Sequence, residues 1–236
     1  MRIVVNHLTR MQYGYICIAG IDPDTGKHVR PTPEGDRWRR PDLVRQGGPF
    51  DIAALVELGR ASYDGHAPEV EDYRVRPTHA RRQRDLTPTE FWDLLSSVAR
   101  PRLREIFGQD LQQQSKSFAV AEGNGSASLG CLLLARPPIL HLTRPDEVRL
   151  SFNADPQGPS IKVTDLRLYT GNAGSPAMAR GEVVGRLNER MRQGVAVILS
   201  VGLGRPFQRD GDDTPRHWLQ VNNIHLQDDP AWTERG

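Results

Sequence analysis

The alternation of apolar and polar residues predicts a chain built mainly from β-strands. Residues 148–153 alternate strictly between the two kinds, which is the pattern of a strand with one buried face. Residues 195–203 form a short, nearly continuous apolar run, typical of a strand buried on both faces. Further strands are expected at 129–142, 161–169 and 217–226. The second half of the chain is therefore expected to be rich in β-structure.

Two segments have the pattern of amphipathic helices. Thr87-Pro88-Thr89-Glu90 has the form of a capping box with proline in the first turn, and the apolar residues that follow predict a helix over 88–98. Ser175-Pro176 has the form of a second helix start. Apolar residues between 184 and 191 then share one helical face, so a helix is expected over 176–193.

The order of these elements indicates an OB-fold. The second half reads as three strands, a helix and two strands, which is the order of a five-stranded Greek-key barrel with a helix between its third and fourth strands. The first half also contains short strands separated by tight turns, at 2–8, 14–21, 27–31, 50–58 and 71–77. The predicted fold class is mainly β with a few helices, arranged as two tandem OB-like Greek-key barrels.

A polar stretch rich in Gln, Gly and Ser separates the two halves. We expect an N-terminal OB-like β domain with a trailing helix at 1–108, a linker at 109–127, and a C-terminal OB-like barrel at 128–236. Sequence similarity between the halves is not apparent, so any duplication would be one of fold.

Composition narrows the function classes without selecting one. The net charge of +2 is too small to indicate nucleic acid by itself, and two cysteines inside apolar runs favour neither disulfides nor a zinc site. Phosphate-binding glycine loops and hydrolase motifs are missing, so we predict no cofactor and lean towards a non-catalytic protein. The N-terminus has no long apolar stretch and no segment could span a bilayer, which favours a cytoplasmic protein without a membrane partner.

Three stretches carry a resemblance to a known family. They are LTR with GYICIAGID and TGKHVRP (8–31), GCLLLARPP with VTDLRLY (130–169), and VILSVGLGRPF with HWLQVNNIHL (197–226). Together they resemble the dual OB-fold family of bacteria that is found around anti-phage and other conflict systems. The resemblance implies two tandem OB-folds that bind nucleic acid, in an accessory or sensor component with an effector protein of the same system as a possible partner. It implies the fold more firmly than the function.

Arginines surround one tryptophan after the N-terminal hairpin. The hairpin ends in Arg30, and the next loop contains Arg37, Trp38, Arg39 and Arg40. OB-folds bind single strands through a positive groove with side chains on which bases stack, and arginine can both bind phosphate and stack. We therefore predict a site for nucleic acid, with single strands favoured, at these residues. The alternative is that Trp38 closes the mouth of the barrel. Five more arginines at 74–84 are interpreted as a basic linker without a ligand.

A second contact region is predicted near the C-terminus. Arg205 lies in a constrained turn rich in glycine and proline, and glycine permits close approach of the backbone to a ligand. In HWLQV, Leu219 and Val221 share one face, so Trp218 points outward if that face is the core. The alternatives are a structural turn charge for Arg205 and a core position for Trp218.

Two other function classes stay open. Asp210, Asp212, Asp213 and His217, with Asp228-Asp229, could hold a divalent ion for metal-dependent chemistry on nucleic acid or nucleotides. Acidic residues next to Gly and Pro are also what surface loops contain, and this interpretation is favoured. A protein-interaction adaptor is the third class. The sequence does not distinguish DNA, RNA or a nucleotide as the ligand.

Overall fold

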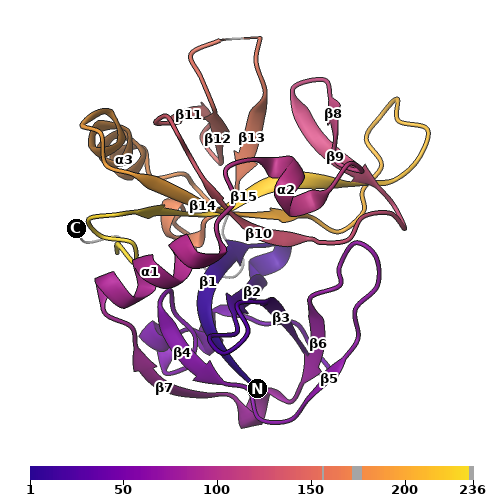
Figure 1. Ribbon diagram of the computed structural model, residues 1–236, viewed down its shortest axis with the longest axis vertical. Coiled ribbons are helices and arrows are strands. Elements are labelled where there is room, and N and C mark those ends of the chain that lie inside the picture. The colour runs from indigo at the N-terminus through magenta and orange to yellow at the C-terminus, as the bar shows by residue number, and fades with distance from the viewer. Residues whose placement is uncertain (156, 172–176, 234–236) are drawn as a thin grey trace.

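Two curled β-sheets, one from each half of the chain, form the computed structural model (Figure 1), which describes residues 1–155, 157–171 and 177–233. The first sheet has the order β5-β6-β3-β2-β1-β4-β7, and the second has the path β10-β14-β15-β13-β12-β11 with β9 also paired to β15. The strands of the first half are β1 Arg2–Arg10, β2 Ile16–Ile21, β3 His28–Pro33, β4 Ala54–Glu57, β5 Ala61–Tyr63, β6 Asp72–Val75 and β7 Arg81–Asp85. Those of the second half are β8 Gln112–Gln114, β9 Ser117–Ala121, β10 Leu129–Leu133, β11 Ile139–Arg144, β12 Glu147–Ser151, β13 Ser160–Val163, β14 Val197–Leu203 and β15 Arg216–Leu226. The α-helices are α1 Pro88–Val98, α2 Leu103–Phe107 and α3 Gly181–Arg192.

Each sheet closes into a barrel because one strand is divided into two consecutive pieces that pair with different neighbours. In the first half β4 and β5 follow one another along the chain, with β4 paired to β1 and β5 paired to β6. The parallel pair of β3 and β6 completes the circuit. In the second half β10 and β11 are the two pieces of the first strand, and β13 pairs in parallel with β15. Both circuits have the connectivity of the OB-fold, and α3 lies between the third and fourth strands of the second barrel, as the sequence predicts.

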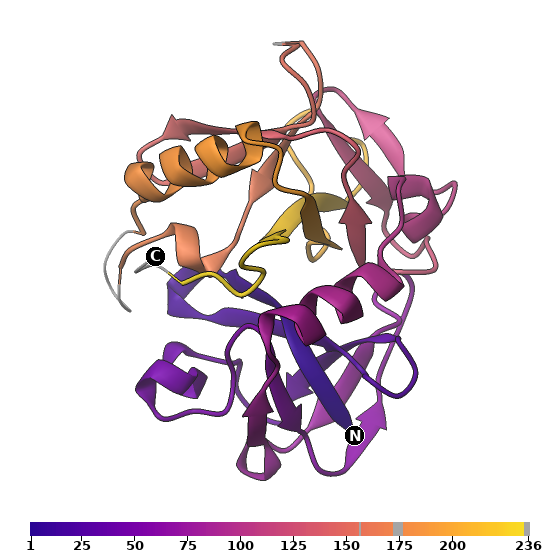
Figure 2. The same cartoon turned by 60° about the vertical axis from the view of Figure 1, so that its left-hand side comes forward.

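The first predicted helix is confirmed at both ends. The Thr87 side chain accepts a hydrogen bond from the Glu90 N–H, and the Glu90 carboxylate accepts one from the Thr87 N–H, so the capping box is formed. Phe91 and Leu95 are buried in the core of the first barrel. Figure 2 shows α1 along the junction of the two sheets, and the Phe91 ring lies 5.3 Å from that of His225 on β15.

The second helix begins later than predicted. Ser175-Pro176 lies outside the described residues, and α3 starts at Gly181. Residues 177–180 are not helical because their backbone bonds to other segments: the Thr170 N–H donates to Met178 O, the Ala179 N–H to Pro145 O and the Arg180 N–H to Leu168 O. The predicted apolar face is present, because Val184, Leu187 and Met191 are buried.

The stretch expected as a linker at 109–127 contains a β-hairpin. β8 pairs with β9, and β9 pairs with β15 of the second barrel. Phe107, Leu111 and Val120 belong to the hydrophobic core of that barrel. The side chains of β8 are polar because this short strand is largely exposed, and this explains why its composition resembles that of a linker.

Polar side chains are buried where the two barrels meet. The Asn6 side chain on β1 donates to Ser200 Oγ on β14 at 3.0 Å, and Asn223 Oδ1 on β15 accepts from the Leu8 N–H at 2.6 Å. His225 Nε2 lies 3.0 Å from Ser200 Oγ. Because these side chains are buried and directional, they hold the barrels in one relative orientation.

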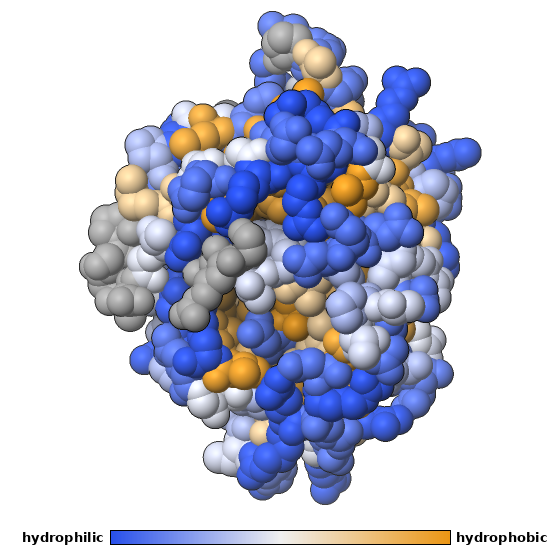
Figure 3. Space-filling model, turned by 90° about the vertical axis from the view of Figure 1, so that its left-hand side faces the viewer, coloured by the Kyte–Doolittle hydropathy of each residue, from blue (hydrophilic) through white to orange (hydrophobic). Residues whose placement is uncertain are grey.

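One face of the molecule is mainly polar (Figure 3). Figure 3 shows hydrophilic residues over most of one side of the molecule, with small groups of apolar residues between them. Within the described residues, no helix is long and apolar enough to cross a membrane.

Candidate nucleic-acid interface between the two barrels

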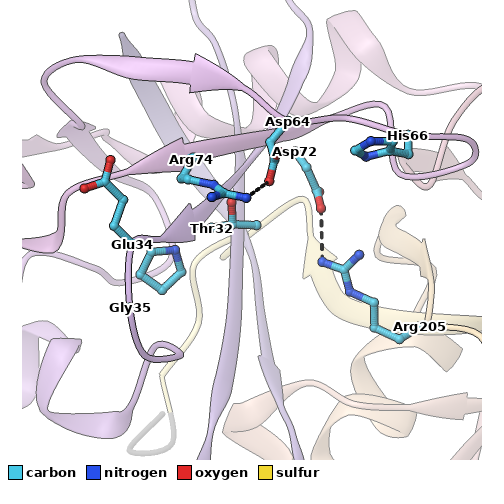
Figure 4. Close-up of a pocket in the computed structure, with 9 residues that line it drawn as sticks. Thr32, Glu34, Gly35, Asp64, His66, Asp72, Arg74 and Arg205 are labelled. Carbon is cyan, nitrogen blue, oxygen red and sulfur yellow. Dashed lines mark hydrogen bonds and ion pairs between the residues drawn. The ribbon is translucent and has the colours of Figure 1, made fainter.

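A polar pocket of about 460 Å³ lies where the barrels meet (Figure 4). The first barrel supplies the end of β3, the following turn, and β6 with the loop before it, and the second barrel supplies Arg205 from the β14–β15 loop. The lining residues are Thr32, Pro33, Glu34, Gly35, Asp64, His66, Asp72, Arg74 and Arg205. The pocket is thus shared by the two halves of the chain.

Asp72 joins two arginines that the sequence assigned to different contact regions. Its Oδ1 accepts from Arg30 Nε at 2.5 Å, and its Oδ2 accepts from Arg205 Nη2 at 3.0 Å. Arg205 Nη1 also donates to Glu69 Oε1 at 2.8 Å. Arg30 and Asp72 are buried, whereas the Arg205 side chain is 56% exposed. Arg205 therefore bridges the barrels while part of its guanidinium group faces solvent.

Arg74 is the second cation of the pocket. Its Nη2 donates to Asp64 Oδ2 at 2.8 Å, and its side chain is 56% exposed. This bond lowers the pKa of the Asp64 carboxyl, which therefore stays ionised at neutral pH. Each pocket arginine is partly neutralised by a carboxylate, so an anionic ligand would compete with Asp64 and Asp72 for their N–H groups.

Glu71 fastens the first barrel to the second beside the pocket. Its carboxylate accepts hydrogen bonds from the N–H groups of Ser128 and Leu129 and from Ser128 Oγ. Burial raises the pKa of Glu71, although the bonds from Ser128 oppose this rise. Glu69 and Asp72 bond to Arg205, so three carboxylates of the segment from Glu69 to Asp72 contact the second barrel.

Trp38 lies inside the first barrel. Its side chain is 4% exposed, its ring packs 4.9 Å from the Phe50 ring, and its Nε1–H donates to Pro31 O at 2.7 Å. A base could not stack on this ring in the present structure. The packing agrees with the alternative, a tryptophan that closes the barrel core.

The arginines around Trp38 are on the surface. Arg37 and Arg39 each place the guanidinium carbon about 5 Å from the centre of the Tyr15 ring, at 5.3 and 5.2 Å. Arg39 also pairs with Asp36. Arg40 begins a short 3₁₀ turn and has an intermediate exposure. In loop 34–40, Trp38 thus points into the barrel, whereas Arg37 and Arg39 face solvent. Tyr15 is an aromatic partner of these two arginines that the sequence did not indicate.

Trp218 lies on the face opposite to Leu219 and Val221, as the strand alternation predicts. It is nevertheless only 7% exposed, because the β14–β15 loop folds over it. Arg209 places its guanidinium carbon 3.2 Å from the ring centre, and the Trp218 Nε1–H donates to Phe207 O at 3.0 Å. Trp218 therefore supports the loop that carries Arg205.

The acidic residues of the β14–β15 loop do not converge on His217. The His217 ring is buried, and its Nδ1 lies 2.9 Å from Gly204 O and 3.7 Å from Glu69 Oε1. Asp212 accepts from the Arg209 N–H, and Asp228 and Asp229 pair with Arg190. Among the described residues, no group of three or more His, Cys, Asp or Glu side chains has the geometry of a metal site.

Sequence reasoning missed the acidic half of the pocket. Residues 71–77 have a strand pattern, and this pattern does not indicate that Asp72 would meet Arg205 more than 130 residues away. Arg74 was included in the stretch interpreted as a basic linker without a ligand. The alternation along β6 could have indicated these residues. Asp72 and Arg74 alternate with Tyr73 and Val75, so both point to one face of the strand.

The two closed barrels, with loops of both on either side of a shared pocket, define a tandem OB-fold protein. A comparison with protein families agrees: the dual OB-containing domain family matches residues 1–224, and the chain belongs to this family. No curated protein sequence matches the chain.

Proposed function

We propose that the protein binds single-stranded nucleic acid across the pocket between its two barrels. The observation that carries this proposal is the meeting of cations from both barrels at one pocket, at loops that OB-folds use for ligands. In this fold, oligonucleotides bind through the loops between strands one and two and between strands four and five. The loop 64–71 and the loop 204–215 are the four–five loops of the two barrels, and the Arg205–Glu69 bond joins them.

The size and charge of the pocket suit a flexible strand. A volume of about 460 Å³ is in the range of small-ligand sites and is comparable to the space that one nucleotide of an unpaired strand needs. Arg74 and Arg205 can turn partly exposed guanidinium groups towards a phosphate, and Arg30 has a buried Nη2 without a hydrogen-bond partner. Bidentate contacts between guanidinium and phosphate are favourable charge-assisted hydrogen bonds.

The family resemblance supports a proposal for the cellular role. We propose a non-catalytic, cytoplasmic accessory or sensor component of a bacterial conflict or anti-phage system, acting with an effector protein of that system. Capture of single strands is a suitable task for such a component because it requires recognition and no reaction.

Binding is tested with fluorescently labelled single- and double-stranded DNA and RNA of equal length, at 50 and 200 mM salt. We expect single strands to bind best, with a loss of roughly 10²- to 10³-fold in affinity between the two salt concentrations if about six phosphates are contacted. Tighter binding to duplexes, or no binding to any of the four probes, would refute the proposal.

Arg74→Ala is expected to flatten the slope of log affinity against log salt by about 0.7 for one lost phosphate contact with a single strand. Arg192→Ala is the matched control, because this arginine on α3 is also exposed and paired with one carboxylate, that of Glu189. The control is expected to keep the wild-type slope. Equal slopes for wild type and Arg74→Ala would show that Arg74 does not contact a phosphate of the bound strand.

A further inference from the structure

Tyr13 is exposed in a way that neither the pocket nor the core explains. Its side chain is 85% exposed, more than that of any other large apolar residue in the described part of the chain. It lies in the turn between β1 and β2 with φ 59° and ψ 26°. This left-handed conformation is unfavourable for a bulky residue, and such outliers concentrate at functional sites.

The turn that carries Tyr13 is firmly attached to the barrel. The Met11 N–H donates to Tyr15 O at 2.9 Å, and the Tyr15 N–H donates to Gln12 O at 3.3 Å. On its far side the Ile16 N–H donates to Trp38 O at 3.0 Å, and Tyr15 forms a β-bridge with Arg39. Because Trp38 is buried in the core, the turn and the arginine loop are held side by side.

Cations flank the tyrosine turn. The guanidinium groups of Arg37 and Arg39 lie against the Tyr15 ring, two residues along the chain from Tyr13. Asp36 neutralises part of the charge of Arg39. The surface thus combines a free aromatic face with two arginines, which is the combination that binds single strands without sequence preference.

We propose that Tyr13 is a stacking platform for an unpaired base, and that Arg37 and Arg39 contact the adjacent phosphates. This inference rests on the proposed function and gives it a second contact point. The turn is the one–two loop of the first barrel, the other loop that OB-folds use for oligonucleotides. Gly35 lines the pocket and Arg37 is two residues further on, so loop 34–39 runs from the pocket to the arginines beside the Tyr15 ring.

Tyr13→Gly separates the role of the ring from the stability of the fold. Glycine adopts positive φ without strain, so this variant is expected to melt at or above the wild-type temperature. Its affinity for a single-stranded oligonucleotide is expected to fall about 5- to 150-fold, the range for loss of one stacked base, with an unchanged salt slope. Tyr13→Phe keeps the ring and is expected to bind within about twofold of wild type.

A second probe tests stacking directly. In an oligonucleotide of the same length whose sugars carry no bases, the phosphates are the same but nothing can stack. Wild type and Tyr13→Gly are expected to bind this probe equally. If wild type binds the normal oligonucleotide and Tyr13→Gly binds it equally well, the stacking platform is wrong while the proposed function stands. If wild type binds neither probe, both proposals are wrong.

Discussion

Trp38→Ala is expected to lower the free energy of unfolding by about 3–5 kcal/mol, the usual cost of truncating a large aromatic residue in a core. The ring is buried against Phe50, and its Nε1–H is bonded to Pro31 O, so the alanine variant loses packing and leaves a buried carbonyl without its donor. Urea unfolding followed by circular dichroism measures the loss. A change below about 1 kcal/mol would mean that Trp38 is not part of the core in solution.

Trp38→Phe shows whether the residue also acts at the interface. Phenylalanine preserves most of the packing and loses the single hydrogen bond, so the variant is expected to fold with a loss of about 1 to 2 kcal/mol. Because the Trp38 ring has no free face, single-strand affinity of the folded variant is expected within about twofold of wild type. If Trp38→Phe folds but binds much more weakly than wild type, Trp38 belongs to the binding site, as the sequence predicts.

The protein is expected to lose several kcal/mol of stability between about pH 6.5 and pH 4. Burial lowers the pKa of His225 to about 4 and that of His7 well below its usual value, and it lowers the pKa of the partly exposed His28 to about 4. In this window the unfolded chain binds protons that the folded chain rejects, so stability falls as the pH falls. For His225 alone, the shift from 6.5 corresponds to about 3 kcal/mol. Glu71 acts in the opposite direction, because burial raises the pKa of its carboxyl.

His225→Asn is the variant that tests this origin. The imidazole bonds through Nδ1 to Pro230 O and through Nε2 to Ser200 Oγ, so its replacement lowers stability at pH 7.5. The slope of stability against pH between pH 6 and 4.5 is expected to decrease by about 1.4 kcal/mol per pH unit, the value for one proton. Urea unfolding at several pH values measures both quantities. Parallel curves for wild type and His225→Asn would show that this histidine does not remain neutral in the folded state.

Features determined by neighbouring residues were predictable from the sequence. The capping box of Thr87 and Glu90 involves residues three apart, and the alternation in β12 needs only six residues. The start of α3 was not predictable in this way, because its preceding residues bond to Leu168 and Pro145 in other segments. The first strand of the hairpin, β8, has polar residues for the same reason that a linker has them, which is exposure. Composition cannot separate these two cases.

The candidate site was predictable in its charges but not in its geometry. Arg30 and Arg205 stood out in the sequence, and the structure brings both to Asp72. The sequence could not show which member of Arg37-Trp38-Arg39 points inward, because these residues lie in a loop and the orientation of Trp38 is set by its contacts with Phe50 and Pro31. The sequence does not indicate Tyr13, because it lies in a turn where no periodicity marks the exposed side. It does not indicate the role of Tyr15, because its partners Arg37 and Arg39 lie in a loop that is distant in the sequence.

The buried polar contacts of β1 also constrain the order in which the chain can mature. Asn6 and Leu8 are synthesised long before their partners Ser200 and Asn223, from which about 200 residues separate them. During translation the first barrel therefore emerges with a polar face that has no partner until β14 and β15 have left the ribosome. Contacts of such high sequence separation slow folding, because a long loop must close before they form. We expect the docking of the barrels to follow the synthesis of the second barrel, so that the first half is exposed to chaperones and proteases until then.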